Sequence, residues 1–215
     1  MNPLKPDSGA ITTARRTRSR RGEGDKLRAD IIDAVERLLL ETGDESLVSM
    51  RAIAKAVGVS PPALYMHFED KDSMIEAVCD RRFRELNEVL GAARGSTEDP
   101  VEGLKRMGEA YIRFGTDNPE PYRLLMMNKT EIDHGESLTT AEPAEGDLAF
   151  IQLVSQVSAC IESGRFKAAD PLETSLIVWS AVHGLTALMI SQPNFEWPPT
   201  VVDRLVEMVV AGLAP

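Results

Sequence analysis

The sequence predicts an all-α protein in which a small N-terminal helical domain precedes a larger helical bundle. Apolar residues recur at spacings of three and four in most segments, which is the period of an amphipathic helix. No stretch alternates apolar and polar residues for long enough to form a strand. The 215 residues, 43% hydrophobic and 27% charged, are enough for one small and one larger helical domain.

Residues 1–24 have no apolar periodicity and are rich in Arg, Ser, Thr and Gly, so we expect a flexible arm. This arm contains six Lys or Arg and two acids, whereas residues 91–215 contain nine Lys or Arg and eighteen Asp or Glu. The C-terminal part therefore carries a formal charge of −9, close to the net charge of −10 of the whole chain. A basic end on an acidic protein is typical of phosphate binding at that end only. A solubilising tail is the alternative.

The first helix is expected over residues 25–42. Ile31, Val35 and Leu39 form one apolar stripe along it, and Gly43 is placed to end it.

Two short helices with a glycine between them follow, within the segment SMRAIAKAVGVSPPALYMHFEDK. Ser49 is placed to cap the first helix, and Gly58 to end it. Ser60 is placed to cap the second, over residues 61–67, where Pro61 suits the first turn because its missing N–H needs no partner there. Two helices joined by a three-residue turn have the geometry of a helix-turn-helix, whose second helix enters the DNA major groove. An ordinary corner of a helical bundle is the alternative.

The rest of the chain is expected to form a bundle of longer helices. Asp70 is placed to cap a helix that runs to about residue 92, and residues 91–100 (GAARGSTEDP) have the composition of a linker. Residues 130–146 are acidic, with Gly, Thr and Pro, and predict a loop. The further helices are expected at about 101–116, 119–128, 146–163, 171–191 and 198–213.

Residues 27–75, above all IAKAVGVSPPALYMHFEDKDSMI, resemble the DNA-binding domain of TetR-type regulators. The resemblance implies three DNA-binding helices joined by a fourth to a ligand-binding, dimerising bundle. We therefore expect a basic arm over 1–24, a DNA-binding domain over 25–70, and an effector-binding and dimerisation domain over 71–215. The segment WSAVHGL is similar to the Trp-His-Gly signature of one C-terminal domain type in this family.

The candidate DNA contacts lie in and around the helix-turn-helix. The hydroxyl, imidazole and ammonium groups of this segment are of the types that bind phosphate. The double proline departs from the family pattern, so Pro62 is expected to shape the helix start rather than to contact a base. The predicted contacts are Ser49, Arg51, Ser60, Pro61, Ala63, Tyr65, Met66, His67 and Lys71, with Arg15, Arg16 and Arg18 of the arm.

A candidate ligand pocket is centred on Trp179 and His183, which lie four residues apart and so share a helix face. One interpretation is that Trp179 packs on an effector and His183 forms a hydrogen bond to it. The other is a buried Trp and a core His with a partner of its own. Phe114, Tyr122, Met126 and Met127 are expected to line the same pocket, or else to belong to the core.

The last two helices, 171–191 and 198–213, carry apolar residues on more than one face. We expect them to form the interface of a homodimer, with burial beneath the 130–146 loop as the alternative. Residues 174–192 have no charged residue but contain Ser, Thr, His and Gly, which favours a buried helix over a membrane span. With no apolar segment of a secretory signal and two cysteines far apart, a cytoplasmic location is expected.

The expected function is that of a homodimeric, sequence-specific repressor released from operator DNA by a small, lipophilic ligand; repression and ligand release are implied by the resemblance. No nucleophile–base pair, phosphate loop or Cys/His cluster is recognisable, so no enzyme activity, metal or cofactor is expected. The alternatives are a small helical enzyme, a helical protein-interaction module, or a small-molecule-binding protein without a DNA function.

Overall fold

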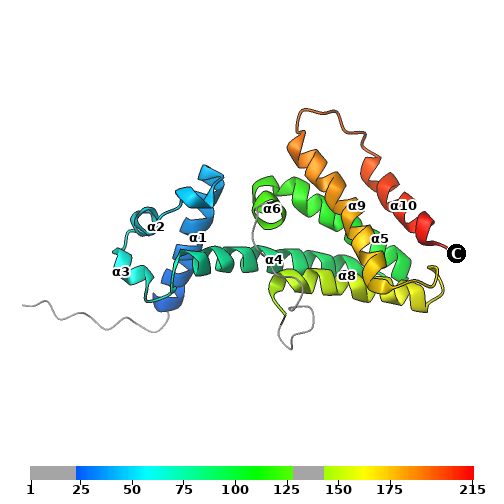
Figure 1. The fold of residues 1–215 in the computed structure, drawn as a ribbon, viewed down its shortest axis with the longest axis horizontal. Coiled ribbons are helices and arrows are strands. Elements are labelled where there is room, and N and C mark those ends of the chain that lie inside the picture. The colour runs from blue at the N-terminus through cyan, green and yellow to red at the C-terminus, as the bar shows by residue number, and fades with distance from the viewer. Residues whose placement is uncertain (1–22, 128–142) are drawn as a thin grey trace, which may run out of the picture.

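The structure, a computed structural model, describes residues 23–127 and 143–215, and within these ranges it contains helices, turns and no strand. The predicted all-α class is confirmed. Figure 1 shows a group of short helices at one end, a bundle at the other, and the long helix α4 (Lys71–Gly95) running through both. Most of the predicted arm and of the predicted 130–146 loop lies outside the described residues.

The N-terminal group packs around a single apolar core. Its elements are α1 (Glu23–Thr42), the 3-10 helix η1 (Glu45–Leu47), α2 (Met50–Val57) and α3 (Pro61–Leu64). Ile31 and Val35 of α1 meet Ile53 of α2 and Leu64 of α3 in this core. Gly43 and Gly58 have positive φ angles of 64° and 79°, which glycine adopts without strain, so both predicted helix ends are confirmed.

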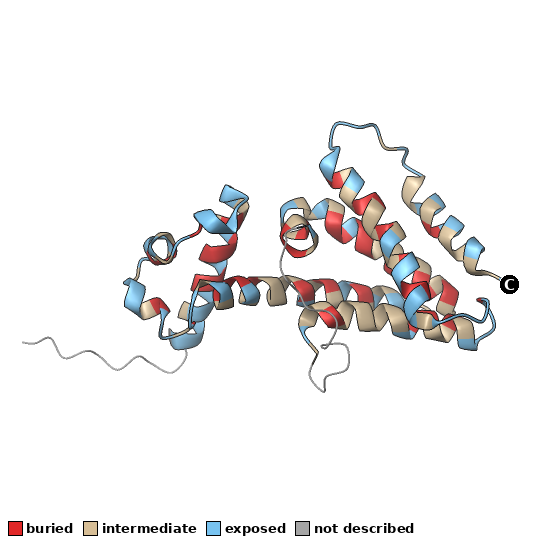
Figure 2. Ribbon diagram, in the orientation of Figure 1, coloured by how far each residue is buried: buried red, intermediate tan, exposed pale blue. Residues whose placement is uncertain are grey.

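The C-terminal bundle surrounds α5. Its helices are α5 (Pro100–Asp117), α6 (Pro119–Met126), α8 (Glu145–Glu162), α9 (Pro171–Ser191) and α10 (Val201–Leu213). Helix α5 packs against all of the others and against α4. Figure 2 shows the buried residues of α4, α5 and α9 on the sides that face one another.

Three predicted boundaries are wrong. Helix α4 continues to Gly95 because Ala92, Ala93 and Arg94 are good helix formers, and the linker shrinks to the residues before Pro100. The second short helix ends at Leu64, after which residues 65–67 form turns, and α10 starts at Val201 rather than at residue 198.

Helix α4 belongs to both cores. Its first turns contribute Met74 and Val78 to the N-terminal core, and its later turns contribute Phe83 and Leu86 to the bundle core. A capping box starts the helix: Asp70 accepts a hydrogen bond from the Ser73 backbone N–H at 2.8 Å. One continuous helix therefore connects the two parts.

Helix α9 is, by length and composition alone, apolar enough to cross a membrane. It packs against α5, α8 and α10 with Val178, Val182 and Leu185 buried, as the core helix of a helical domain does. A buried core helix can have the same length and hydropathy as a membrane-spanning helix.

Candidate DNA-binding and ligand-binding sites

The N-terminal group has helix-turn-helix geometry. Ser49 caps α2 by accepting a hydrogen bond from the Ala52 backbone N–H at 3.2 Å. Gly58 then turns the chain, and α3 begins at Pro61. The Ser60 side chain makes no capping hydrogen bond. Its exposed hydroxyl remains available to a ligand such as a phosphate oxygen.

The surface of α3 and the turn after it is largely exposed (Figure 2). Leu64 is fully buried and anchors α3, while Tyr65 and Met66 are 57% and 72% exposed. Large apolar and aromatic side chains on a surface are typical of binding surfaces. Of the predicted DNA contacts, six are exposed (Ser49, Arg51, Ser60, Pro61, Tyr65, Met66), three are half-buried (Ala63, His67, Lys71), and Arg15, Arg16 and Arg18 lie outside the described residues.

Lys71 has a structural contact beside its predicted DNA contact. Its Nζ donates a hydrogen bond to the backbone carbonyl of Glu45 at 3.0 Å, which ties the start of α4 to η1. An ammonium group has three donors, so this bond leaves capacity for a phosphate.

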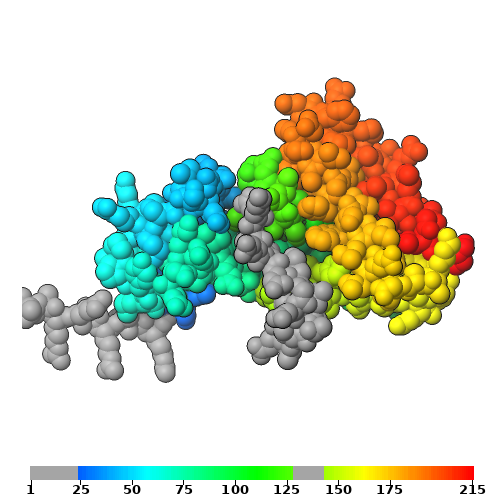
Figure 3. Space-filling view, in the orientation of Figure 1, coloured from blue at the N-terminus to red at the C-terminus, as the bar shows by residue number. Residues whose placement is uncertain are grey.

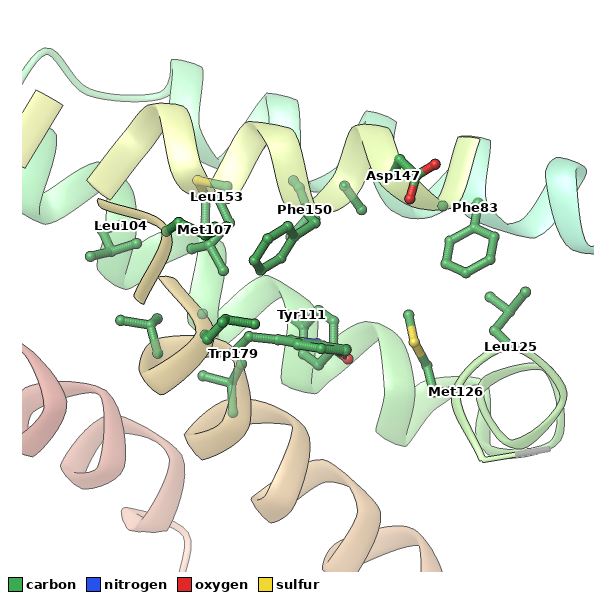
Figure 4. Close-up of a pocket in the computed structure, with 18 residues that line it drawn as sticks. Phe83, Leu104, Met107, Tyr111, Leu125, Met126, Asp147, Phe150, Leu153 and Trp179 are labelled. Atoms are coloured by element: carbon green, nitrogen blue, oxygen red, sulfur yellow. Dashed lines mark hydrogen bonds between the residues drawn. The ribbon is translucent and has the colours of Figure 1, made fainter. Parts of the chain in front are cut away.

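The bundle contains a cavity of about 440 Å³ between α4, α5, α6, α8 and α9. Figure 4 shows Leu104, Met107 and Leu153 at one end, Phe150, Tyr111 and Trp179 in the middle, and Phe83, Asp147, Leu125 and Met126 at the other end. The volume and the apolar lining are those of a small-molecule site.

A buried hydrogen-bond network lies behind the middle of the cavity. Trp179 Nε1 donates to the Tyr111 hydroxyl at 3.2 Å, and the hydroxyls of Tyr111 and Tyr122 are 3.0 Å apart. The Tyr122 hydroxyl is 2.6 Å from Nδ1 of His183. Burial raises the pKa of both tyrosines and lowers the pKa of His183, so all three groups are neutral near pH 7.

The structure separates the predicted ligand residues into three groups. Met126 and Trp179 line the cavity. Tyr122 and His183 do not line it but hold the network behind its wall. Phe114 is buried in the bundle core, and Met127 is 43% exposed.

Sequence reasoning missed Tyr111, the residue that joins the cavity to the network. One signal was available, because a buried tyrosine needs a polar partner and the sequence has only three tyrosines. Its partners, however, lie on two other helices, Tyr122 on α6 and Trp179 on α9, and nothing in the sequence pairs Tyr111 with them. Phe83, Asp147 and Phe150 were missed for the same reason.

The N-terminal group is fastened to α4 by charged side chains. Arg81 and Arg82 of α4 both form ion pairs with Glu36 of α1, whose side chain is 9% exposed. Arg81 also binds Asp33, and Arg82 binds Glu85 at 2.7 Å. A buried carboxylate held by two guanidinium groups keeps α1 and α4 in one orientation.

Among the residues that the structure describes, no group of three His, Cys, Asp or Glu is placed to hold a metal ion. Burial raises the pKa of Cys79 and Cys160 to about 11, which disfavours the reactive thiolates.

Two family models match the chain. Residues 31–78 match the model described as bacterial regulatory proteins, tetR family, and residues 104–213 match the tetracyclin repressor-like C-terminal domain. The second match covers half of the chain.

Curated relatives resemble part of the chain. The nucleoid occlusion factor SlmA of Haemophilus ducreyi is 29% identical over 109 residues, 50% of this chain and 54% of the relative. The HTH-type transcriptional activator FasR of Mycolicibacterium smegmatis is 29% identical over 136 residues, 62% of this chain and 61% of the relative. The alignments thus span little more than half the length of these relatives.

Solved structures share the whole fold. A protein of unknown function from Rhodococcus sp. RHA1 has a TM-score of 0.70 at 22% identity, covering 88% of this chain and 96% of that one. A TetR family transcription regulator from Marinobacter aquaeolei VT8 has a TM-score of 0.67 at 23% identity, covering 91% and 99%. The helix-turn-helix geometry and the two family matches show that the chain belongs to the TetR family of bacterial regulatory proteins, which are DNA-binding transcription regulators.

Proposed function

We propose that this protein is a homodimeric repressor that binds operator DNA through α2 and α3 and is released by a small lipophilic molecule in the bundle cavity. The observation that carries the proposal is that two helices of the cavity wall, α4 and α6, also enter the N-terminal core. A ligand that displaces either helix therefore displaces the helix-turn-helix.

Helix α6 makes this connection within three residues. Leu124 packs into the N-terminal core, while the adjacent Leu125 and Met126 line the cavity. Helix α4 makes it along its length, with Val78 in the N-terminal core and Phe83 in the cavity wall. Ligand binding and DNA binding then favour different positions of the same helices, so each weakens the other by the same factor.

The DNA surface is tested by Tyr65→Phe and Lys71→Ala. Each change is expected to weaken binding of DNA from the protein's own promoter region. Lys71→Ala is also expected to reduce the slope of log affinity against log salt concentration by about one released counterion. Lys167→Ala is the matched control, because Lys167 also donates to a backbone carbonyl, that of Gly212, but lies far from the helix-turn-helix. Fluorescence anisotropy at several salt concentrations measures both effects. Unchanged affinity in both variants contradicts this DNA surface.

The direction of regulation is tested with a promoter reporter. Repression predicts that reporter output rises when the ligand is added and when the gene for this protein is deleted. FasR is named an activator, so the opposite response is a defined alternative. A fall in output on deletion refutes the repressor assignment and leaves DNA binding intact.

The proposed dimer interface is the outer side of α9 and α10, part of which is visible in Figure 3. Ile177 and Leu188 of α9 are 56% and 54% exposed, and Met208 of α10 is 69% exposed. Three large apolar side chains on neighbouring helices favour a covering partner, and a second copy can cover the face by twofold symmetry.

The interface is tested by Ile177→Glu, measured by sedimentation velocity. A charge at the centre of a two-copy contact is expected to give a monomer with weakened DNA binding. Leu47→Glu is the matched control for the oligomeric state alone, because Leu47 is 63% exposed and lies in η1, away from α9 and α10 but within the DNA-binding group. A dimer that persists in Ile177→Glu contradicts this interface.

A further inference from the structure

Few polar side chains line the bundle cavity. Among the described residues of the wall, only Tyr111, Asp147 and Trp179 have polar side-chain atoms, and none carries a positive charge. The single N–H of Trp179 is already donated to the Tyr111 oxygen. Trp179 therefore has no donor left for a ligand.

The bond lengths of the network assign the proton of the Tyr111 hydroxyl to the side away from the cavity. The 2.6 Å between the Tyr122 oxygen and Nδ1 of His183 suits an O–H donor, because bonds donated by N–H groups are usually about 2.9–3.0 Å long. This length assigns the acceptor role to Nδ1 of His183 and the donor role to the Tyr122 hydroxyl. The Tyr111 proton then points to the Tyr122 oxygen at 3.0 Å or to Nδ1 at 3.3 Å.

Burial keeps the three groups of the network neutral. It lowers the pKa of His183, so one ring nitrogen carries no proton, and the short bond to Tyr122 assigns that nitrogen to Nδ1. Burial raises the pKa of both tyrosines, so each keeps the proton that it donates. Neither Tyr122 nor His183 lines the cavity, so both donated protons lie behind the wall.

We propose that the cavity selects lipophilic molecules whose polar group donates a hydrogen bond, an O–H or N–H, and that it discriminates against carboxylates. Tyr111 is the acceptor: its oxygen receives one bond from Trp179, donates its own proton inward, and has accepting capacity left. The inference rests on the proposed function of the cavity as the ligand site and names the ligand class.

Asp147 adds to the same selectivity. It is 1% exposed and lies beside Phe83 at the end of the cavity (Figure 4). Its side chain offers oxygen acceptors and no cation to a ligand. Because Asp147 already takes part in an interaction within the protein, we assign Tyr111 as the acceptor for the hydrogen-bond donor of the ligand.

The test uses four probes with one alkyl chain and different head groups: decanol, decylamine, decanoate and methyl decanoate. A linear chain suits the elongated cavity, and its burial supplies affinity that the probes share. Calorimetry on the full chain is expected to show decanol and decylamine binding about tenfold or more tightly than decanoate. Decanol is expected to exceed methyl decanoate, which has no donor, by about threefold to tenfold.

Tyr111→Phe and Tyr122→Phe are matched variants, because each removes one hydroxyl from the same network. Only Tyr111 lines the cavity, so Tyr111→Phe is expected to abolish the advantage of decanol over methyl decanoate. Tyr122→Phe is expected to retain the advantage, with the Tyr111 proton passing to His183. Helical circular dichroism checks that both variants fold.

Three results overturn the proposed preference for ligands that donate a hydrogen bond. The first is decanoate or methyl decanoate binding as tightly as decanol. The second is an unchanged decanol advantage in Tyr111→Phe. The third is tight binding of decylamine alone, which would assign the selectivity to charge. Failure of all four probes to bind also overturns the cavity as a lipophile site, whereas tight binding of decanoate leaves that proposed function standing.

Discussion

Gly115 of α5 is the position where adding a single methyl group has the sharpest expected consequence. It is buried where α5, α6 and α9 meet, beside the network of Tyr122 and His183. A Cβ atom there would lie 2.3 Å from Cγ2 of Thr186 and 2.8 Å from Cδ2 of Tyr122. Carbon atoms pack at about 3.5–4.0 Å, so Gly115→Ala must push α6 and α9 away from α5.

The magnitude follows from two opposing effects. Overpacking a filled core costs about 1–3 kcal/mol, and alanine gains about 1 kcal/mol over glycine in a helix interior. Gly108 lies two turns earlier in α5, and its Cβ would meet Val206 Cγ2 at an ordinary 3.4 Å. Since the helix preference is shared, the difference between Gly108→Ala and Gly115→Ala isolates the clash, about 1–3 kcal/mol.

Urea unfolding followed by circular dichroism measures this difference. Gly108→Ala is expected to keep or raise the free energy of unfolding, and Gly115→Ala to lower it by up to about 2 kcal/mol, or about 2–8 °C in Tm. Thr186→Ser removes the clashing Cγ2 while keeping the hydroxyl that bonds to Val182, so it is expected to rescue part of the loss. Equal stabilisation by the two alanines would refute the close approach of these helices.

Two further predictions concern charged and titratable groups. Glu36→Gln is expected to lower the free energy of unfolding by about 1–3 kcal/mol, because Arg81 and Arg82 lose a shared carboxylate. Glu85→Gln is expected to lower it by under about 1 kcal/mol, because the Glu85 side chain is 44% exposed. Urea unfolding measures both. A larger loss in Glu85→Gln contradicts this ranking. Burial lowers the pKa of His183 in the fold, so the unfolded chain binds the extra proton first, and stability is expected to fall as pH drops below about 6.5. His183→Gln should flatten this dependence, and an unaltered pH profile would argue against it.

The sequence by itself determined the local features of this protein. Ser49 and Asp70 start helices through side-chain caps, and Gly43 and Gly58 end them in left-handed conformations. Each of these depends on contacts within four residues, so composition and spacing are enough to predict it. The helix-turn-helix and the all-α class follow from such signals, and the resemblance to the TetR family rested on the same segment.

Tertiary structure decided the cavity and its chemistry. Trp179 and His183 share a face of α9, as their spacing predicts, yet only Trp179 lines the cavity. Tyr111 and Tyr122 come from α5 and α6 and complete the network that orients the protons. A period of 3.6 residues determines which side chains share a helix face but not which other helix that face meets. That pairing is set by packing between segments about 60 to 70 residues apart. The same packing determines which head group we expect the cavity to accept.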